Sequence, residues 1–184
     1  MQICVIGWDF NKSLYQSLSS TDYDAFTVLH KKGDTQGVPF QLVPNVGLEW
    51  GAYDYFLQNN WDRRSPVLFM QDDITVKSPT FFKEVSLLKD DFVFIYDRLA
   101  SCVANERLFV GTGQCFKTSS KFLDYYLDKY SGFWYDLENT GIFDDNGTQD
   151  KGIGRFIQRL KSIDKDTIMK VNNHILMQEY IIIN

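Results

Sequence analysis

The chain has 184 residues, 44% of them hydrophobic, which is enough to build one globular domain over residues 1–184. Its formal net charge of −5 provides no basic field, so nucleic acid is excluded as an expected partner. The N-terminal residues lack a signal-peptide pattern and no apolar run reaches the length of a membrane span, so we expect a cytoplasmic protein.

Strands and helices alternate through the first sixty residues. Short runs rich in β-branched or aromatic residues predict strands, and apolar residues at helical spacing predict helices. The predicted strands span residues 3–6, 25–30 and 40–43, and the predicted helices span residues 9–20 and begin again at Leu48. The first strand is not followed by a Gly-x-Gly-x-x-Gly fingerprint, which argues against a dinucleotide-binding dehydrogenase.

The most informative stretch is the apolar run 67–70, which is followed by Gln71 and by two adjacent carboxylates, Asp72 and Asp73. Four large apolar residues in a row are typical of a strand buried on both faces of a parallel sheet. Ligands of open α/β sheets bind at the carboxyl ends of strands, and adjacent carboxylates are stabilised by a cation or by several donors. The pair therefore indicates a metal or polar-ligand site, or else a turn in which one Asp caps the chain and the other is solvated.

The remainder of the chain continues the alternation. Further helices are predicted over residues 78–88, 121–130 and 151–160, further strands over 92–96, 167–171 and 174–183, and a glycine-rich bend over 111–117 that feeds a strand. The tract 131–150 is too long for an ordinary connection, which favours a lid or an acceptor loop. This order predicts an α/β fold with a single mixed, mostly parallel sheet flanked by helices.

Several side chains are expected beside Asp73, because parallel strands end at the same edge of a sheet. We predict a nucleoside site there, formed by Ile6, Gly7, Trp8, Asp9, Lys32 and Asn45. Backbone donors at the start of the helix that follows Gly47 suit a phosphate or a hydroxyl group. Aromatic residues make up 16% of the chain, which suits a site that stacks flat ligands or an aromatic-rich core.

Four short blocks occur in the order found in GT-A-fold glycosyltransferases, which transfer sugars from nucleotide diphosphates. The blocks are Lys32-Gly33, Asn45-Val46-Gly47-Leu48-Glu49, Gly51-Ala52-Tyr53 and Leu68-Phe69-Met70-Gln71-Asp72-Asp73. From Ile3 to about Leu160 the chain resembles small bacterial and viral sugar-transferase-like members of this group. The resemblance implies a GT-A, Rossmann-like fold and a nucleotide-diphosphate sugar as donor, with a UDP-sugar favoured.

The resemblance also implies roles for individual residues. The family's Asp-x-Asp motif maps to residues 71–73, with Gln in place of the first acid, and its last acid makes Asp73 the expected ligand of Mn²⁺ or Mg²⁺. His174 resembles a late histidine that some members use as a further metal or phosphate ligand, although a lone His is more often structural. The residues that these blocks place at the donor are Gly47, Glu49, Tyr53, Gln71 and Asp72, the last on the ribose or the sugar.

Members that invert the anomeric centre often carry an acidic base at the start of a late helix. Asp150, followed by Gly154, resembles this base and implies metal-assisted, inverting transfer to a hydroxyl of a glycan, lipid or protein-linked acceptor. The alternative for Asp150 is an ordinary acid stabilised by the dipole of the helix that it precedes. The alternative for the whole chain is a non-catalytic nucleotide-sugar or carbohydrate-binding domain on the same fold.

Overall fold

A computed structural model describes residues 1–95, 115–133, 159–160, 162–163, 169, 171–174 and 180–183 of the chain. The helices are α1 (Lys12–Ser19), α2 (Leu48–Asn59), α3 (Phe81–Leu87) and α4 (Ser120–Tyr130). The strands are β1 (Gln2–Gly7), β2 (Asp24–Leu29), β3 (Phe40–Leu42), β4 (Val67–Gln71), β5 (Ile74–Val76), β6 (Phe92–Ile95), β7 (Cys115–Thr118), β8 (Val171–His174) and β9 (Ile181–Ile183).

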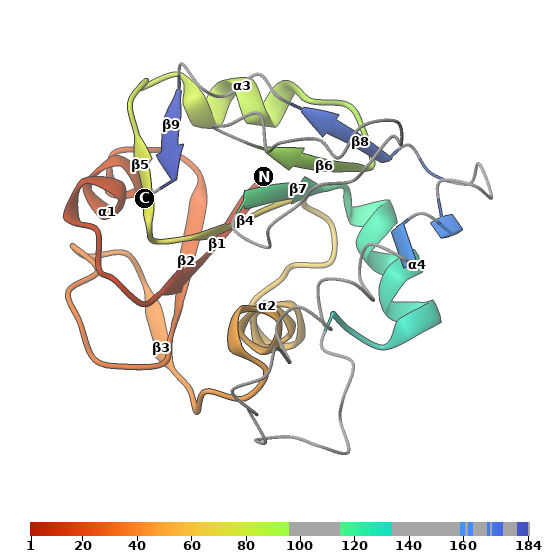
Figure 1. Ribbon diagram of the computed structural model, residues 1–184, viewed down its shortest axis with the longest axis horizontal. Coiled ribbons are helices and arrows are strands. Elements are labelled where there is room, and N and C mark those ends of the chain that lie inside the picture. Colours follow the sequence, from red (N-terminus) through yellow and green to blue (C-terminus); the bar gives the residue numbers. More distant parts are fainter. Residues whose placement is uncertain are drawn as a thin grey trace, which may run out of the picture.

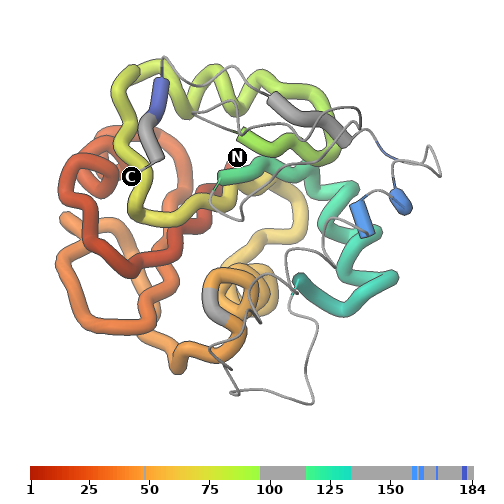
Figure 2. The backbone as a smooth tube through the Cα atoms, in the orientation of Figure 1, coloured from red at the N-terminus to blue at the C-terminus, as the bar shows by residue number. Residues whose placement is uncertain are grey.

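The main sheet has seven strands within the described part of the chain, in the order β3-β2-β1-β4-β7-β6-β8 (Figure 1). β1 pairs in parallel with both β2 and β4, which lie beside it although they are distant in sequence (Figure 2). The β2–β3 and β6–β8 pairs are also parallel, whereas β7 runs antiparallel to β4 and β6. The predicted mixed, mostly parallel sheet is therefore confirmed. A second sheet, formed by β5 and β9, was not predicted.

Helices cover both faces of the main sheet (Figure 1). Residues of α2 and α4 pack on one face with side chains of β1, β4, β6 and β7. Residues of α1 and α3 pack on the other face with the alternate side chains of the same strands. Because β1 and β4 are covered on both sides, their sequences read as continuous apolar runs rather than as an alternating pattern.

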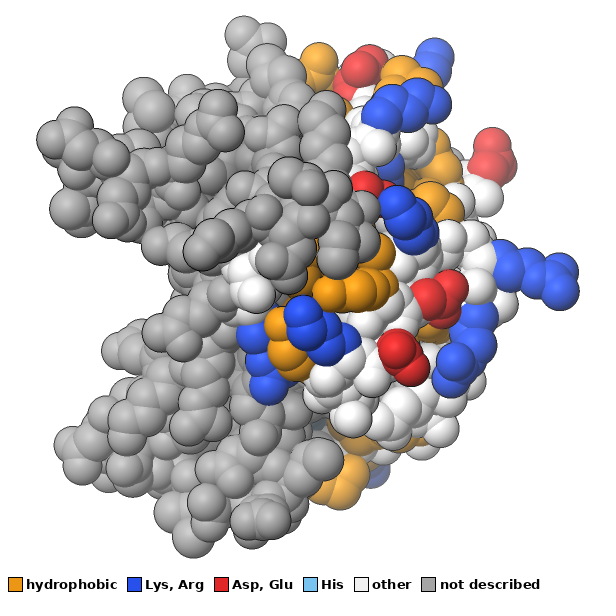
Figure 3. All heavy atoms as spheres, turned by 90° about the vertical axis from the view of Figure 1, so that its right-hand side faces the viewer, with side chains coloured by type: hydrophobic (Ala, Val, Ile, Leu, Met, Phe, Trp, Pro, Cys, Tyr) orange, Lys and Arg blue, Asp and Glu red, His pale blue; other side chains and the backbone are white. Residues whose placement is uncertain are grey.

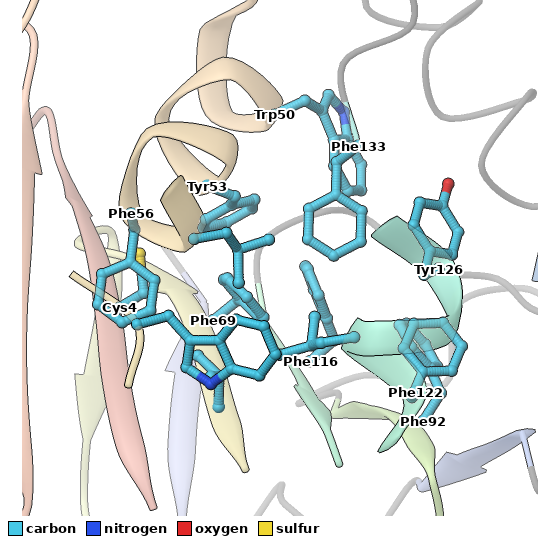
Figure 4. Packing of buried hydrophobic residues seen from close by; sticks show 14 of the residues in the cluster. Cys4, Trp50, Tyr53, Phe56, Phe69, Phe92, Phe116, Phe122, Tyr126 and Phe133 are labelled. Atoms are coloured by element: carbon cyan, nitrogen blue, oxygen red, sulfur yellow. The ribbon is translucent and has the colours of Figure 1, made fainter. Parts of the chain in front are cut away.

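Aromatic rings dominate the core on the α2 and α4 side (Figure 4). The ring of Phe69 stacks on Phe116 at 4.8 Å between centroids and meets Tyr53 edge-on at 4.9 Å. Phe133 joins this cluster, and its backbone N–H donates to Oδ1 of Asp54 on α2 at 2.7 Å. The high aromatic content of the sequence therefore builds a core, one of the two uses that it suggested.

Local capping explains where two helices begin. The Asn11 side chain accepts a hydrogen bond from Ser13 N at 3.1 Å before α1. The Ser119 hydroxyl accepts one from Phe122 N at 3.0 Å before α4. Both side chains satisfy N–H groups that the first turn of a helix leaves without a backbone partner.

The third helix begins later than predicted, at Phe81 instead of Ser78. The backbone N–H groups of Lys77 and Ser78 donate to Tyr180 O, which ties this segment to the chain just before β9. Ser78 O accepts from Phe81 N at 3.1 Å and Ser78 Oγ accepts from Thr80 N at 3.3 Å, so a turn precedes the helix and Thr80 is the residue before it.

The C-terminal strands also differ from the prediction, because Asn172 and Asn173 lie inside β8 instead of separating two strands. β8 is an edge strand that pairs only with β6 in the described sheet, and edge positions accept polar residues. The predicted bend at 111–114, the tract 134–150 and most of the helix 151–160 lie outside the described residues.

Within the described residues, no helix combines the length and apolar composition that crossing a bilayer requires.

The face at the right-hand side of Figure 1 carries Lys and Arg side chains interspersed with Asp and Glu (Figure 3). Its described part therefore presents mixed charge, in keeping with the small net charge of the chain.

We predict that Phe69→Ala lowers the free energy of unfolding by about 3 to 5 kcal/mol, because the fully buried ring leaves a cavity among other rings. Urea unfolding followed by circular dichroism measures this change. Phe40→Ala is the matched control, because Phe40 is 52% exposed and its loss should change stability by less than about 0.5 kcal/mol. Equal losses in the two variants would contradict the assignment of Phe69 to the core.

Candidate functional site

A pocket of about 290 Å³ opens at the carboxyl ends of β1, β2 and β4. Its volume lies at the lower end of the range for small-molecule sites. The residues that line it are Ile6, Trp8, Asp9, His30, Glu49, Gln71, Asp72 and Asp73. All but His30 were predicted as site residues from the sequence, and the pocket lies at the sheet edge where ligands of open α/β folds bind.

The strand register brings these residues together. Gly7 pairs with Leu29, so Trp8 and His30 emerge next to each other from adjacent strands. Ile6 pairs with Gln71, which places the Asp72-Asp73 turn on the other side of β1. A Cβ on Gly7 would lie 2.1 Å from Leu29 Cδ2 and 2.8 Å from the Tyr15 hydroxyl, so only glycine allows the chain to leave β1 this closely.

Asp72 is buried beneath the loop that connects β1 to α1. Its Oδ1 accepts hydrogen bonds from Trp8 N and Asp9 N, both at 2.9 Å. Its Oδ2 accepts from Phe10 N at 2.6 Å and from the Tyr15 hydroxyl at 3.2 Å. These four donors match the roughly four lone-pair positions of a carboxylate, so the side chain is engaged by the protein itself.

Tyr15 supports Asp72 from the core. Burial and the nearby negative charge of Asp72 both raise the pKa of the Tyr15 phenol well above its usual value. The hydroxyl therefore keeps its proton at neutral pH and remains a donor to the carboxylate. α1, which carries Tyr15, is thereby linked to the end of β4.

Asp73 occupies the second position of the turn between β4 and β5 and lines the pocket. Two further carboxylates line the same pocket from other elements. Asp9 is exposed in the loop after β1, and Glu49 is buried in the first turn of α2. The pocket is thus acidic on three sides, which favours a cation or a ligand rich in hydroxyl groups.

Trp8 forms an open aromatic surface at the rim of the pocket. Its side chain is 46% exposed, and Lys31 Nζ lies 5.2 Å from the centroid of its ring. The His30 ring meets it edge-on at 6.2 Å. A large exposed indole beside a cation suits stacking of a planar group such as a nucleobase.

His30 is the pocket residue that sequence reasoning missed. Both ring nitrogens are buried and have no hydrogen-bond partner among the described residues. Burying such nitrogens without partners costs free energy, which a ligand that donates or accepts would offset. The sequence could have indicated His30 as a pocket residue, because it ends the predicted strand 25–30, and that strand ends at the same sheet edge as β1.

Several predicted site residues lie away from the pocket lining. Tyr53 is fully buried in the aromatic cluster (Figure 4), while Lys32 is exposed and Asn45 is half-buried. Gly47, with φ of 81°, precedes α2 and permits its sharp start. Lys31, not Lys32, contacts the Trp8 ring.

The remaining two predicted site residues are His174 and Asp150. The backbone of His174 ends β8, which runs parallel to β6 and lies three strand spacings from β4, roughly 14 Å across the sheet. Asp150 lies outside the described residues. Their assigned roles stay predictions.

No protein-family model matches the chain, and no curated protein matches its sequence. Solved structures do match its fold. One is a protein assigned as a glucose-1-phosphate thymidylyltransferase from Bacillus anthracis, in complex with sucrose, at 11% identity and a TM-score of 0.51, over 95% of this chain and 87% of that one. Another is a glycosyltransferase involved in glycosylation of the major capsid of PBCV-1, at 9% identity and a TM-score of 0.51, over 95% of this chain and 82% of that one.

This chain has a nucleotide-sugar transferase-like fold. The resemblance that the four sequence blocks suggested is therefore confirmed at the level of the fold. At these identities the likeness defines the architecture and not the reaction, which the pocket itself must support.

We predict that His30→Leu leaves the free energy of unfolding within about 1 kcal/mol of the parent value or raises it, because it removes two buried nitrogens that lack partners among the described residues. Tyr15→Phe provides the contrast, since it removes a buried hydroxyl that donates to the Asp72 carboxylate and should cost about 1.5 to 3 kcal/mol. Urea titration of the three proteins measures both values. A loss above 2 kcal/mol for His30→Leu would indicate a structural role.

Proposed function

We propose that the protein transfers a sugar from a nucleotide-diphosphate donor, with a UDP-sugar favoured, to a hydroxyl group of a glycan, lipid or protein-linked acceptor. The main support is the acidic pocket at the carboxyl ends of β1, β2 and β4, where an exposed indole and Asp73 come together. The fold shared with sugar-handling transferases agrees with this reading.

The β1 side of the pocket supports binding of the nucleoside. The exposed ring of Trp8 offers a surface on which a base stacks, and the carboxylate of Asp9 next to it can accept hydrogen bonds from ribose hydroxyls. His30, whose ring meets Trp8 edge-on at 6.2 Å, adds a polar group to the same pocket. Together they match a flat, hydroxyl-bearing ligand.

Asp73 supports binding of the diphosphate through a divalent cation. The described residues contain no group of three His, Cys, Asp or Glu able to hold a metal by themselves. Mg²⁺ and Mn²⁺ are commonly held by one or two carboxylates plus oxygens of a bound phosphate, and Asp73 fits that donor set. A bound cation would offset negative charge on the departing diphosphate.

For the acceptor half of the reaction we propose Asp150 as the general base of an inverting transfer. Its carboxylate would take the proton of the attacking hydroxyl. The support is its position in the sequence, at the end of the long tract 131–150 and before an amphipathic segment with Ile153, Phe156 and Leu160. The residue lies outside the described ranges, so its proposed role depends on the sequence alone.

A second candidate function is a non-catalytic domain that binds a nucleotide sugar. It is favoured by Gln71, which stands where the related motif has its first acid and lines the pocket. Calorimetry with UDP-sugars, together with assays of donor hydrolysis and transfer, separates the two. Binding without turnover under any acceptor condition would favour the binding domain.

We predict that Asp73→Asn abolishes manganese-dependent binding of UDP while the protein stays folded, because the neutral amide is a much weaker ligand for a divalent cation. Isothermal titration with and without Mn²⁺ measures the affinity. Asp22→Asn is the matched control, since Asp22 is exposed near the start of β2, at the opposite end of the strands from the pocket. An affinity for UDP within twofold of the parent would exclude Asp73 as the metal ligand.

We predict that Asp150→Asn slows sugar transfer by roughly a hundredfold or more and leaves UDP affinity unchanged, as expected for loss of a general base. Initial-rate assays at saturating donor, with UDP affinity measured in parallel, test this. Asp22→Asn is the control, because it makes the same change at an exposed position near the start of β2, at the opposite end of the strands from the pocket. A transfer rate within a few-fold of the parent would move the search for the base to Asp144, Asp145 or Glu49.

A further inference from the structure

The loop after β1 directs three consecutive backbone N–H groups at one carboxylate. Trp8 N and Asp9 N donate to Asp72 Oδ1 at 2.9 Å, and Phe10 N donates to Oδ2 at 2.6 Å. Successive N–H groups that converge in this way form an anion-binding concavity, the arrangement that holds phosphate in many nucleotide sites. In this protein the anionic group comes from its own chain.

Contacts of Asp72, Tyr15 and Phe10 fix the conformation of this loop. Asp72 is only 1% exposed beneath it, and the Tyr15 hydroxyl binds the same carboxylate from the core at 3.2 Å. Phe10 has a positive φ of 56°, and its ring packs where Gly33 has no side chain, since a Cβ there would lie 2.0 Å from the ring. The conformation is therefore determined by the protein and needs no ligand.

We propose that Asp72 is a positioning residue that occupies the anion-binding loop at residues 8–10, so that the phosphates of the donor bind outside this loop and only its nucleoside contacts the loop. This inference rests on the proposed function and deepens it. The carboxylate holds Trp8 and Asp9 at the rim of the pocket before the donor arrives, which reduces the entropy lost on binding. Asp72 then does not bind the ribose or the sugar of the nucleotide-sugar donor, the role that the sequence suggested for it.

The first test requires no ligand. In Asp72→Asn, one acceptor oxygen is replaced by an NH₂ group that faces N–H donors, so amide hydrogen exchange at Trp8, Asp9 and Phe10 should quicken at least tenfold. Exchange in the core amides of β1 should change less than threefold, whereas general destabilisation would quicken both sets equally. Unchanged exchange at residues 8–10 would overturn the proposal.

The matched control is Asp62→Asn. Asp62 makes the same kind of carboxylate-to-loop contact, accepting from Arg64 N at 2.8 Å and Ser65 N at 2.7 Å, but it precedes β4 and so lies at the opposite end of the strands from the pocket. Its substitution should quicken exchange only at its own loop and leave UDP affinity within twofold. Should Asp72→Asn fail to fold, Asp72→Ser keeps one acceptor oxygen in a smaller side chain and serves in its place.

The second test compares two probes, uridine and UDP in the presence of Mn²⁺. If the loop contacts only the nucleoside, Asp72→Asn weakens both by the same factor, at least tenfold, because the shared part of the ligand loses its preformed surface. A loss for UDP more than tenfold larger than the loss for uridine would place the phosphates on the loop and overturn the inference. Unchanged affinity for both would overturn the positioning role.

The two proposals fail in different ways. If the unsubstituted protein binds neither probe, the proposed function is wrong. The amide-exchange comparison between Asp72→Asn and Asp62→Asn would still decide whether Asp72 holds the loop, because that measurement uses the protein alone.

Discussion

The pocket depends on the position of β1 between two parallel neighbours, β2 and β4. All three strands end at the same sheet edge, so residues that are distant in sequence, such as Trp8, His30 and Asp73, line one cavity. This arrangement is stable because helices bury both faces of the sheet, which lets strands of continuous apolar sequence occupy its centre. The polar residues that line the pocket lie at the strand ends, outside this core, so they do not weaken it.

The adjacent residues Asp72 and Asp73 have different surroundings and therefore different proposed roles. Asp72 is buried and meets four protein donors, and Asp73 is one residue further along the turn and lines the pocket. A carboxylate whose lone pairs are taken by backbone N–H groups stabilises a loop, and one that lines an acidic pocket is placed to hold a cation. The four protein donors compensate the charge of Asp72, and the proposed cation would compensate that of Asp73.

The fold narrows the possible functions but does not select one. The same architecture appears in a protein assigned as a thymidylyltransferase and in a capsid glycosyltransferase. The pocket adds chemical restrictions, because a loop whose N–H groups already bind Asp72 has none of them left for a phosphate. A donor bound through its nucleoside and through a cation at Asp73 fits these restrictions, which is why sugar transfer from a nucleotide diphosphate is the proposed function.

Apolar runs and the acids that end them are local signals, so the amino-acid pattern alone predicted the α/β alternation, the central buried strand and most of the pocket lining. Which of these residues share the pocket depended on the tertiary structure. It added His30 through the register of β2, moved Tyr53 into the aromatic core, and placed Asp72 under the loop of residues 8–10. Each of these outcomes depends on contacts between residues distant in the chain, which local spacing does not encode.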